Sequence, residues 1–343
     1  MFKIYNRKIG ENFRPFIIAE ACINHDGNFS KAIKMIIEAK KSNACAIKFQ
    51  MHDLDDEMLK KTPKSKNFKK TLYETLKKTN FTTEQHIKLK NFCEKIGIIY
   101  LCTPFSKKSV DVLVDKVKVK LLKVGSGELT NLPLQEYIAK KKLPTIVSTG
   151  MSELKEIKET VNLFKKFNKK IILTHCTSVY PCPYELSNIG AIPIMREKFN
   201  LSVGLSDHTN TIYTSLGAIA LGATVIEKHF TLNKKSKGPD HASSIEPYEL
   251  KILTEGALAI FQAGGKSKKI HQKERQIIKW ARESVVSTKE INAGEILSKN
   301  NTSVKRPAPN RIEIPAKFLD KVLGKKAKSK ILINRKLKWS QIN

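Results

Sequence analysis

Paired cysteines and long apolar runs are both missing from this sequence of 343 residues. None of the six cysteines stands in a Cys-x-x-Cys pair, and four lie inside apolar runs, a pattern typical of reduced, buried thiols in a cytosolic protein. No apolar run reaches the length of about 18 residues that a membrane helix needs. The N-terminal segment 1–15 also lacks the apolar stretch of a secretory signal peptide. We therefore expect a cytoplasmic protein with no membrane partner.

Acidic residues are scarce beside basic ones, with 32 Asp and Glu against 63 Lys and Arg and a formal net charge of +31. Such an excess suits a protein that binds nucleic acid or anionic metabolites, because the summed field concentrates opposite charge. Lysines spread over solvated surfaces would give the same excess. The densest cluster, residues 60–70, contains one aromatic residue and no nucleic-acid-binding signature. We expect no nucleic-acid partner, and keep a basic nucleic-acid-binding protein on a degenerate scaffold as a distant alternative.

Short apolar runs rich in β-branched residues alternate with helical patterns along the chain. The eight runs occupy residues 16–24, 44–50, 98–105, 120–127, 144–150, 171–178, 201–208 and 224–230. Patterns with apolar residues three and four apart lie between them, for example at 30–42, 83–97, 154–167 and 211–223. This alternation predicts an α/β fold, the (β/α)₈ TIM barrel. The rival is an open doubly wound sheet, which normally shows Gly-x-Gly-x-x-Gly after its first strand, where this chain reads INHDGN.

The composition changes after Gln262. A segment rich in glycine and charge follows, and beyond it short strands, turns and prolines recur with a different rhythm. We predict a barrel over residues 1–265, a linker over 266–281 and a small second domain over 282–343.

Polar residues gather where the eight runs end, at the barrel rim that holds the active site of barrel enzymes. His208 and His229 end the last two runs beside the carboxylates Asp207 and Glu227, so we predict that the two imidazoles bind one divalent ion. His52 has no such strand-end position. Lysine inside a strand is unusual, since a buried ammonium must be paired or face an anion. A pocket for a compact phosphate and carboxylate is therefore predicted around Lys48, Lys123, Thr103, Ser126, Ser148 and Ser206.

Ten blocks of this chain, in this order, resemble the sialic acid synthase family: IAEACINHDG, AIKFQ, DEM, TPFS, KVGSGE, IVSTGM, HCTSVYPCP, GLSDHT, EKHFT and GPDHASS. The segment SVVSTKEINAGEILSKNNTSVKRP is similar to that family's antifreeze-like domain, also called a SAF (β-clip) domain. The resemblance implies a C–C bond-forming transferase. Such an enzyme condenses phosphoenolpyruvate with an N-acylated hexosamine and water, releases phosphate by C–O cleavage and forms a nine-carbon 2-keto acid.

The resemblance also implies roles for particular residues. His208 and His229 would hold a divalent metal, Mn²⁺ first with Mg²⁺ or Co²⁺ as alternatives, which polarises the sugar aldehyde. Glu20 would act as general base or orient a water, and Glu128 would be a second carboxylate near the reacting carbons. The phosphoenolpyruvate-binding positions would be Lys48, Thr103, Lys123, Ser126, Ser148 and Ser206, and the sugar-binding positions Gln50, Asn67, Tyr180, Asp240 and Arg306. Because Arg306 would act in the partner's barrel, the implied assembly is a domain-swapped homodimer.

Two positions depart from family members that act on N-acetylmannosamine, which often read KHQTH and HCTN where this chain has Met51 and Ser178. N-acetylmannosamine, giving N-acetylneuraminic acid, is the first expected acceptor. 2,4-Diacetamido-2,4,6-trideoxymannose, giving legionaminic acid, is the close second. Related phosphoenolpyruvate aldolases that act on phosphorylated sugars would need a second phosphate site and no SAF segment.

Overall fold

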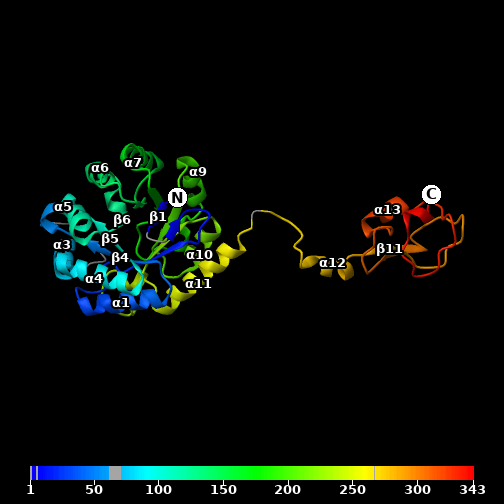
Figure 1. The fold of residues 1–343 in the computed structure, drawn as a ribbon, viewed down its shortest axis with the longest axis horizontal. Coiled ribbons are helices and arrows are strands. Elements are labelled where there is room, and N and C mark those ends of the chain that lie inside the picture. The colour runs from blue at the N-terminus through cyan, green and yellow to red at the C-terminus, as the bar shows by residue number, and fades with distance from the viewer. Residues whose placement is uncertain (1, 5–6, 62–70, 266) are drawn as a thin grey trace. The chain divides into compact units, whose positions relative to one another are not determined.

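A closed barrel of eight parallel strands forms the larger part of the chain, in a computed structural model that describes residues 2–4, 7–61, 71–265 and 267–343 (Figure 1). The strands follow one another around the ring in chain order, and the last pairs with the first through Val225 beside Phe16 and His229 beside Glu20. They are β3 (Phe16–Glu20), β4 (Ala46–Met51), β5 (Ile99–Pro104), β6 (Leu122–Val124), β7 (Thr145–Ser148), β8 (Ile171–Cys176), β9 (Val203–Asp207) and β10 (Val225–His229). Each coincides with one of the eight predicted runs, and only β4 extends past its run, by one residue, so the barrel prediction is confirmed.

Helices surround this ring of strands on the outside (Figure 1). The longer ones are α1 (Phe29–Lys41), α3 (Leu72–Thr79), α4 (Thr83–Ile96), α6 (Leu132–Lys140), α7 (Leu154–Phe167), α9 (Ala191–Phe199), α10 (Tyr213–Ala220) and α11 (Pro247–Ala263). Short helices α2 (Leu54–Glu57), α5 (Lys107–Asp111) and α8 (Tyr184–Ser187) lie in the connections. The bounds of α4 follow from local chemistry, because Thr82 and Gln85 form a capping box at its start and Gly97 takes the left-handed backbone (φ 74°) at its end.

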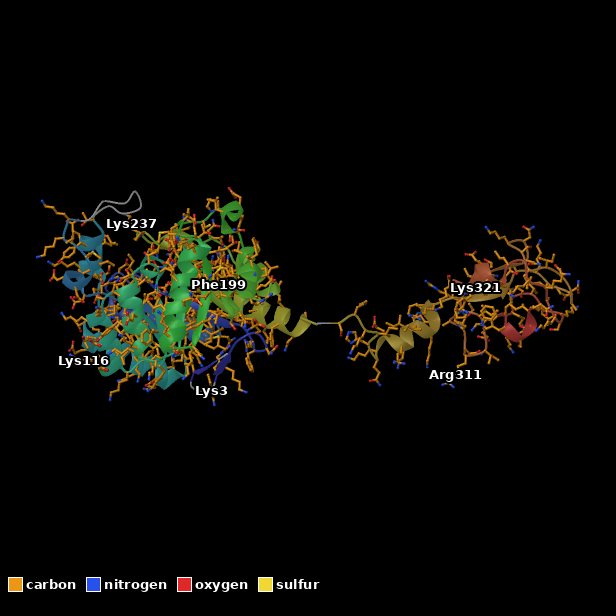
Figure 2. All side chains as sticks on the ribbon, turned by 90° about the horizontal axis from the view of Figure 1, so that it is seen from above. Lys3, Lys116, Phe199, Lys237, Arg311 and Lys321 are labelled. Carbon is orange, nitrogen blue, oxygen red and sulfur yellow. The ribbon has the colours of Figure 1, made fainter. Side chains whose placement is uncertain are left out.

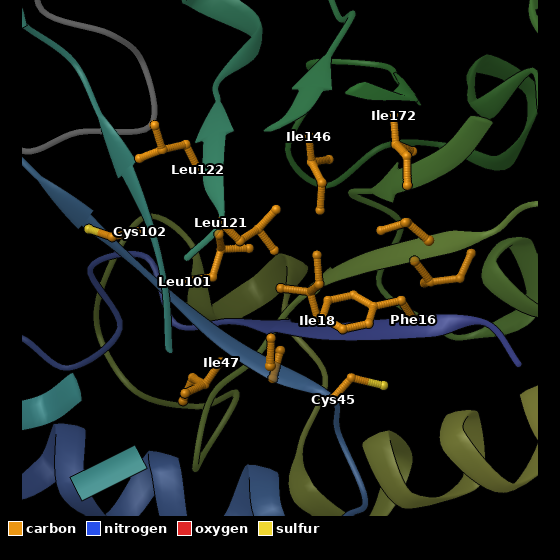
Figure 3. Close-up of a cluster of buried hydrophobic side chains, with 14 of the residues drawn as sticks. Phe16, Ile18, Cys45, Ile47, Leu101, Cys102, Leu121, Leu122, Ile146 and Ile172 are labelled. Atoms are coloured by element: carbon orange, nitrogen blue, oxygen red, sulfur yellow. The ribbon is translucent and has the colours of Figure 1, made fainter. Parts of the chain in front are cut away.

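Alternate side chains of each strand face the barrel interior, and the others face the helices. Phe16 and Ile18 of β3 belong to the buried apolar cluster that Figure 3 shows among the strands. The same alternation divides β9 and β10. Lys228 is fully buried and pairs with Asp207 at 3.2 Å, and Asp207 accepts hydrogen bonds from the hydroxyl groups of Thr214 and Ser215 on α10. That pair therefore lies on the helix side of the sheet.

A short antiparallel hairpin precedes the barrel and had no counterpart in the sequence prediction. Its strands are β1 (Phe2–Ile4) and β2 (Arg7–Ile9). Ile4 and Ile9 are buried and belong to the same apolar cluster as the barrel strands. The strands are too short, and too rich in basic residues, for the apolar pattern to reveal them.

The chain divides into two compact units, Met1–Gly264 and Gly265–Asn343. The second contains α12 (Glu274–Ala281), the antiparallel strands β11 (Ser284–Ser287) and β12 (Thr302–Lys305), and α13 (Leu319–Val322). Its own apolar core consists of Val285, Ile291, Leu297, Ile314, Val322, Ala327, Ile331, Leu337 and Ile342. The backbone N–H of Ala308 donates to the carbonyl of Lys279, so the helix within the predicted linker is tied to this second unit.

Basic side chains such as Lys3, Lys116, Arg311 and Lys321 lie at the periphery of the two units (Figure 2). Most of the lysine-rich segment 60–70 lies outside the described residues. None of the helices that the structure describes is both long and apolar enough to cross a membrane.

Candidate active site

A cavity of about 510 Å³ opens at the carboxyl ends of the barrel strands. It brings together every predicted site residue that lies on the described part of the barrel. These residues are Glu20, Lys48, Gln50, Thr103, Lys123, Ser126, Glu128, Ser148, Tyr180, Ser206, His208, His229 and Asp240. Of the two others, Asn67 lies outside the described residues, and Arg306 is an exposed residue of the second unit.

Two buried lysines and two buried glutamates form the floor of this cavity. The ammonium group of Lys48 lies 2.8 Å from Glu20 and 2.9 Å from Glu227, and Lys123 lies 3.7 Å from Glu227. Burial lowers the pKa of Lys48 to about 8. Burial opposes the charge of Glu227 as well, but Lys123 and Lys48 outweigh it and lower the pKa of this carboxyl group. The floor therefore places two ammonium groups against two carboxyl groups.

Hydroxyl groups surround these charges. Lys123 donates to Ser148, and Ser206 donates to Glu227 at 3.1 Å. The hydroxyl of Ser126 accepts from the backbone N–H of Gly150. Thr103 differs from these, because its buried hydroxyl has no hydrogen-bond partner among the described residues. Ammonium and hydroxyl donors of this kind suit phosphate and carboxylate oxygens, so the floor has the chemistry of an anion site.

His208 and His229 lie side by side, with ring centroids 5.3 Å apart. The Nδ1 atom of His208 lies 2.8 Å from the carbonyl oxygen of Thr177. A carbonyl only accepts, so Nδ1 carries the proton and Nε2 is left with a lone pair. In His229, Nδ1 is buried without a partner among the described residues. Burial, and then the charges of His208 and Lys48, hold the pKa of His229 well below its usual range. The lowered pKa keeps the His229 ring neutral, and an imidazole nitrogen with a free lone pair fits a divalent metal.

A cysteine lies beside this histidine pair. The sulfur of Cys176 is 3.8 Å from Nδ1 of His208. Burial opposes charge on both groups, but their mutual contact outweighs it, lowering the pKa of Cys176 and raising that of His208. The shorter hydrogen bond from Nδ1 to the Thr177 carbonyl orients the His208 ring. The Cys176 sulfur is a second, weaker polar neighbour of the same nitrogen.

Other groups that line the cavity suit a sugar. The ring of Tyr180 packs against His208 at a tilt of 33°, with ring centroids 4.0 Å apart. His52 connects Gln50 and Glu57, through contacts of 3.1 and 2.7 Å from its two ring nitrogens. The sequence analysis did not place His52 in the site, and the structure corrects that, because His52 directly follows β4 and lines the cavity.

Glu128 lies on a 3₁₀ turn, Ser126–Glu128, and is half-buried at the cavity edge. Burial raises its pKa, although a hydrogen bond from Asn131 at 2.7 Å opposes the shift. A carboxyl group with a raised pKa keeps its proton to a higher pH than a free glutamate does.

The two carboxylates expected beside the histidines separate in the structure. Glu227 reaches the floor of the cavity, where it contacts both lysines. Asp207 is directed to the helix side of the sheet, where it pairs with Lys228, so it takes no part in the site. Successive residues of a strand point to opposite faces, which explains why adjacency to His208 in sequence does not bring Asp207 into the cavity.

Comparisons with known proteins agree with this geometry. The NeuB family model matches residues 35–269, and the SAF domain model matches residues 282–343. The chain is 40% identical over 322 residues to the N,N'-diacetyllegionaminic acid synthase of Campylobacter jejuni, covering 91% of this chain and 95% of that protein. It is 34% identical to a pseudaminic acid synthase of Campylobacter jejuni, covering 95% of this chain and 96% of that one. The solved structure of N-acetylneuraminic acid synthetase from Leptospira borgpetersenii, in complex with citrate, is 33% identical with a TM-score of 0.74, and the match covers 81% of this chain and 94% of that chain. This chain therefore belongs to the NeuB family, with a barrel followed by a SAF domain.

Proposed function

We propose that this protein is a phosphoenolpyruvate-dependent nonulosonic acid synthase. The observation that carries the proposal is the cavity floor, where buried Lys48 and Lys123 lie among hydroxyl groups and next to two metal-competent histidines. The floor suits the phosphate and carboxylate of phosphoenolpyruvate. The wall with Tyr180 and Gln50 leaves room for an amino sugar.

The cavity residues have distinct tasks in this reaction. Lys48, Lys123 and the unpaired hydroxyl of Thr103 bind phosphoenolpyruvate and orient its C3 atom toward the sugar aldehyde. His208 and His229 would hold a divalent metal, and when bound that ion would supply Lewis-acid polarisation of the aldehyde oxygen.

Two carboxyl groups then move the protons. C3 attacks the aldehyde carbon, and the new alkoxide takes a proton from Glu128, whose pKa is raised by burial. Water adds at C2 as Glu20 accepts one of its protons. As the C–O bond breaks, the remaining hydroxyl proton at C2 passes to the departing phosphate, which leaves a 2-keto acid and inorganic phosphate. Glu20 then releases its proton and Glu128 regains one through solvent, so atoms and protons balance.

Among acceptors, we favour 2,4-diacetamido-2,4,6-trideoxymannose over N-acetylmannosamine. The cavity wall formed by α2, α3 and neighbouring loops carries apolar side chains, namely Ile23, Met58, Leu72 and Leu76. An apolar wall suits the methyl group at C6 of the deoxy sugar better than a hydroxymethyl group. The 40% identity to a legionaminic acid synthase supports the same choice.

A panel of sugars tests the function. Purified protein with Mn²⁺ and phosphoenolpyruvate is offered N-acetylmannosamine, its 6-phosphate, the diacetamido-trideoxymannose and the altrose analogue that leads to pseudaminic acid. We expect phosphate release to be fastest with the diacetamido-trideoxymannose and to stop with EDTA. Fastest release with another sugar would overturn the acceptor choice alone, whereas no release with any sugar would overturn the reaction.

The ionisation of Lys48 predicts a pH dependence. Because burial lowers its pKa to about 8, its ammonium group is charged below that pH and neutral above it. We expect kcat/KM for phosphoenolpyruvate to fall about tenfold per pH unit above this pKa. The Lys48→Arg variant stays charged, so any activity it retains should lack this fall. A wild-type profile that remains flat well above the pKa would contradict the role of Lys48.

Arg306 gives a separate prediction about the sugar. It is exposed in the second unit, immediately after β12. If it binds the N-acyl group from a partner subunit, Arg306→Ala should raise KM for the sugar about tenfold, the cost of one charged hydrogen bond, with little change in KM for phosphoenolpyruvate. Arg311→Ala, also exposed in this unit, is the matched control. An unchanged KM for the sugar would contradict the proposal that Arg306 acts in the partner's barrel of a domain-swapped homodimer.

A further inference from the structure

Cys22 has an unusual backbone conformation at the edge of the cavity. It follows β3 with φ 44°, in the left-handed region that a residue with a β-carbon seldom adopts. The residue is buried and lines the cavity. Backbone strain at a cavity residue indicates that the position of its side chain matters.

The thiol belongs to a cluster of potential metal ligands. Cys22, His229 and Asp240 each offer one ligand atom, and these atoms all lie within 4.8 Å of one another. The three residues come from the end of β3, the end of β10 and the loop that follows β10. His229 is buried, and its Nδ1 atom has no hydrogen-bond partner among the described residues, which independently indicates a missing ligand.

Cys22 and Cys176, two thiols that line the cavity, differ in whether the neighbouring imidazole nitrogen is free to bind a metal. The sulfur of Cys176 approaches Nδ1 of His208, which is already bonded to the Thr177 carbonyl. That nitrogen is committed, so the contact does not create a metal site. Beside Cys22, the Nδ1 atom of His229 has no hydrogen-bond partner in the part of the chain that the structure describes.

We propose that the thiol of Cys22 is a ligand of the metal centre, joining His229 and Asp240, and that it directs the centre toward softer divalent ions such as Co²⁺ and Zn²⁺. A sulfur, nitrogen and oxygen donor set favours these ions over Mg²⁺ and Mn²⁺. The thiol gives up its proton to solvent as the metal–sulfur bond forms. This inference deepens the proposed function, because it concerns the metal that the synthase would use.

Cobalt spectroscopy tests the ligand without measuring activity. Metal-free wild-type protein is titrated with Co²⁺, and the near-ultraviolet absorption that arises from charge transfer between a thiolate and Co²⁺ is recorded. We expect this absorption to saturate at one Co²⁺ per chain. Binding of Co²⁺ without this charge-transfer absorption, or no binding of Co²⁺ at all, would overturn the assignment of a thiolate ligand.

Two variants identify the sulfur. Cys22→Gly removes the thiol and suits the left-handed backbone, so this variant should fold. It should lose the absorption, and its affinity for Zn²⁺ should fall at least about tenfold, while that for Mn²⁺ changes much less. Cys176→Ser should keep the absorption. Retention of the charge-transfer absorption in Cys22→Gly, or its loss in Cys176→Ser, would refute the inference. If the inference failed in this way, phosphate release by the Mn²⁺-loaded wild type would still support the proposed function.

Discussion

Replacing His229 with alanine is expected to lower metal-dependent phosphate release by a factor on the order of a thousand, because a Lewis-acidic ion contributes several kcal/mol to such a reaction. The side chain lies next to His208, and its buried Nδ1 atom has no partner among the described residues, so its loss removes a proposed metal ligand without breaking a hydrogen bond at that atom. Initial rates at saturating phosphoenolpyruvate and sugar, with Mn²⁺ varied, measure the effect.

His175 provides the control for this variant. It lies on β8 but faces away from the cavity, and its Nε2 atom contacts the carbonyl of Ser187. His175→Ala should keep turnover close to wild type. Near-normal turnover of His229→Ala, with unchanged dependence on Mn²⁺, would contradict the metal assignment.

Lys123→Met is expected to weaken phosphoenolpyruvate binding on the order of a hundredfold, because it removes a buried ammonium group from the binding site of a ligand with several negative charges. The side chain is 1% exposed and donates to Ser148. Glu227 keeps its closer partner Lys48 in this variant, so the free energy of unfolding should change little. Calorimetric titration with phosphoenolpyruvate in the absence of sugar measures the binding.

Lys228→Met separates ligand binding from folding. Lys228 is also a fully buried strand lysine, but it pairs with Asp207 on the helix side of the sheet. Its replacement leaves a buried carboxylate without its cation and should cost about 3–5 kcal/mol of stability in urea unfolding. The folded fraction should still bind phosphoenolpyruvate with wild-type affinity. Equal losses of binding in both lysine variants would mean that Lys123 acts through the fold.

The strands of the barrel could be predicted because parallel strands buried on both faces appear as short apolar runs between amphipathic helices. The cavity could be located at their ends because the topology directs all eight to one rim. Lys48 and Lys123 stood out for a further reason, since an ammonium group inside an apolar run requires a partner. Each lies on the cavity floor next to Glu227.

Other features depend on which face of a strand a side chain occupies, or on loop geometry. Asp207 and Glu227 both adjoin a predicted metal ligand, yet only Glu227 faces the cavity. His52 lines the cavity from the loop that follows β4, where no periodic pattern applies. Cys22 looked like an ordinary buried thiol, because backbone dihedral angles leave no trace in composition.

The fate of the bridging oxygen of phosphoenolpyruvate tests the central claim most directly. Phosphoenolpyruvate labelled with ¹⁸O between C2 and phosphorus is incubated with the protein, Mn²⁺ and the acceptor sugar, and both products are analysed by mass spectrometry. The account predicts that the label leaves with inorganic phosphate, because the C–O bond breaks. Label retained in the 2-keto acid would show P–O cleavage and would contradict the proposed reaction.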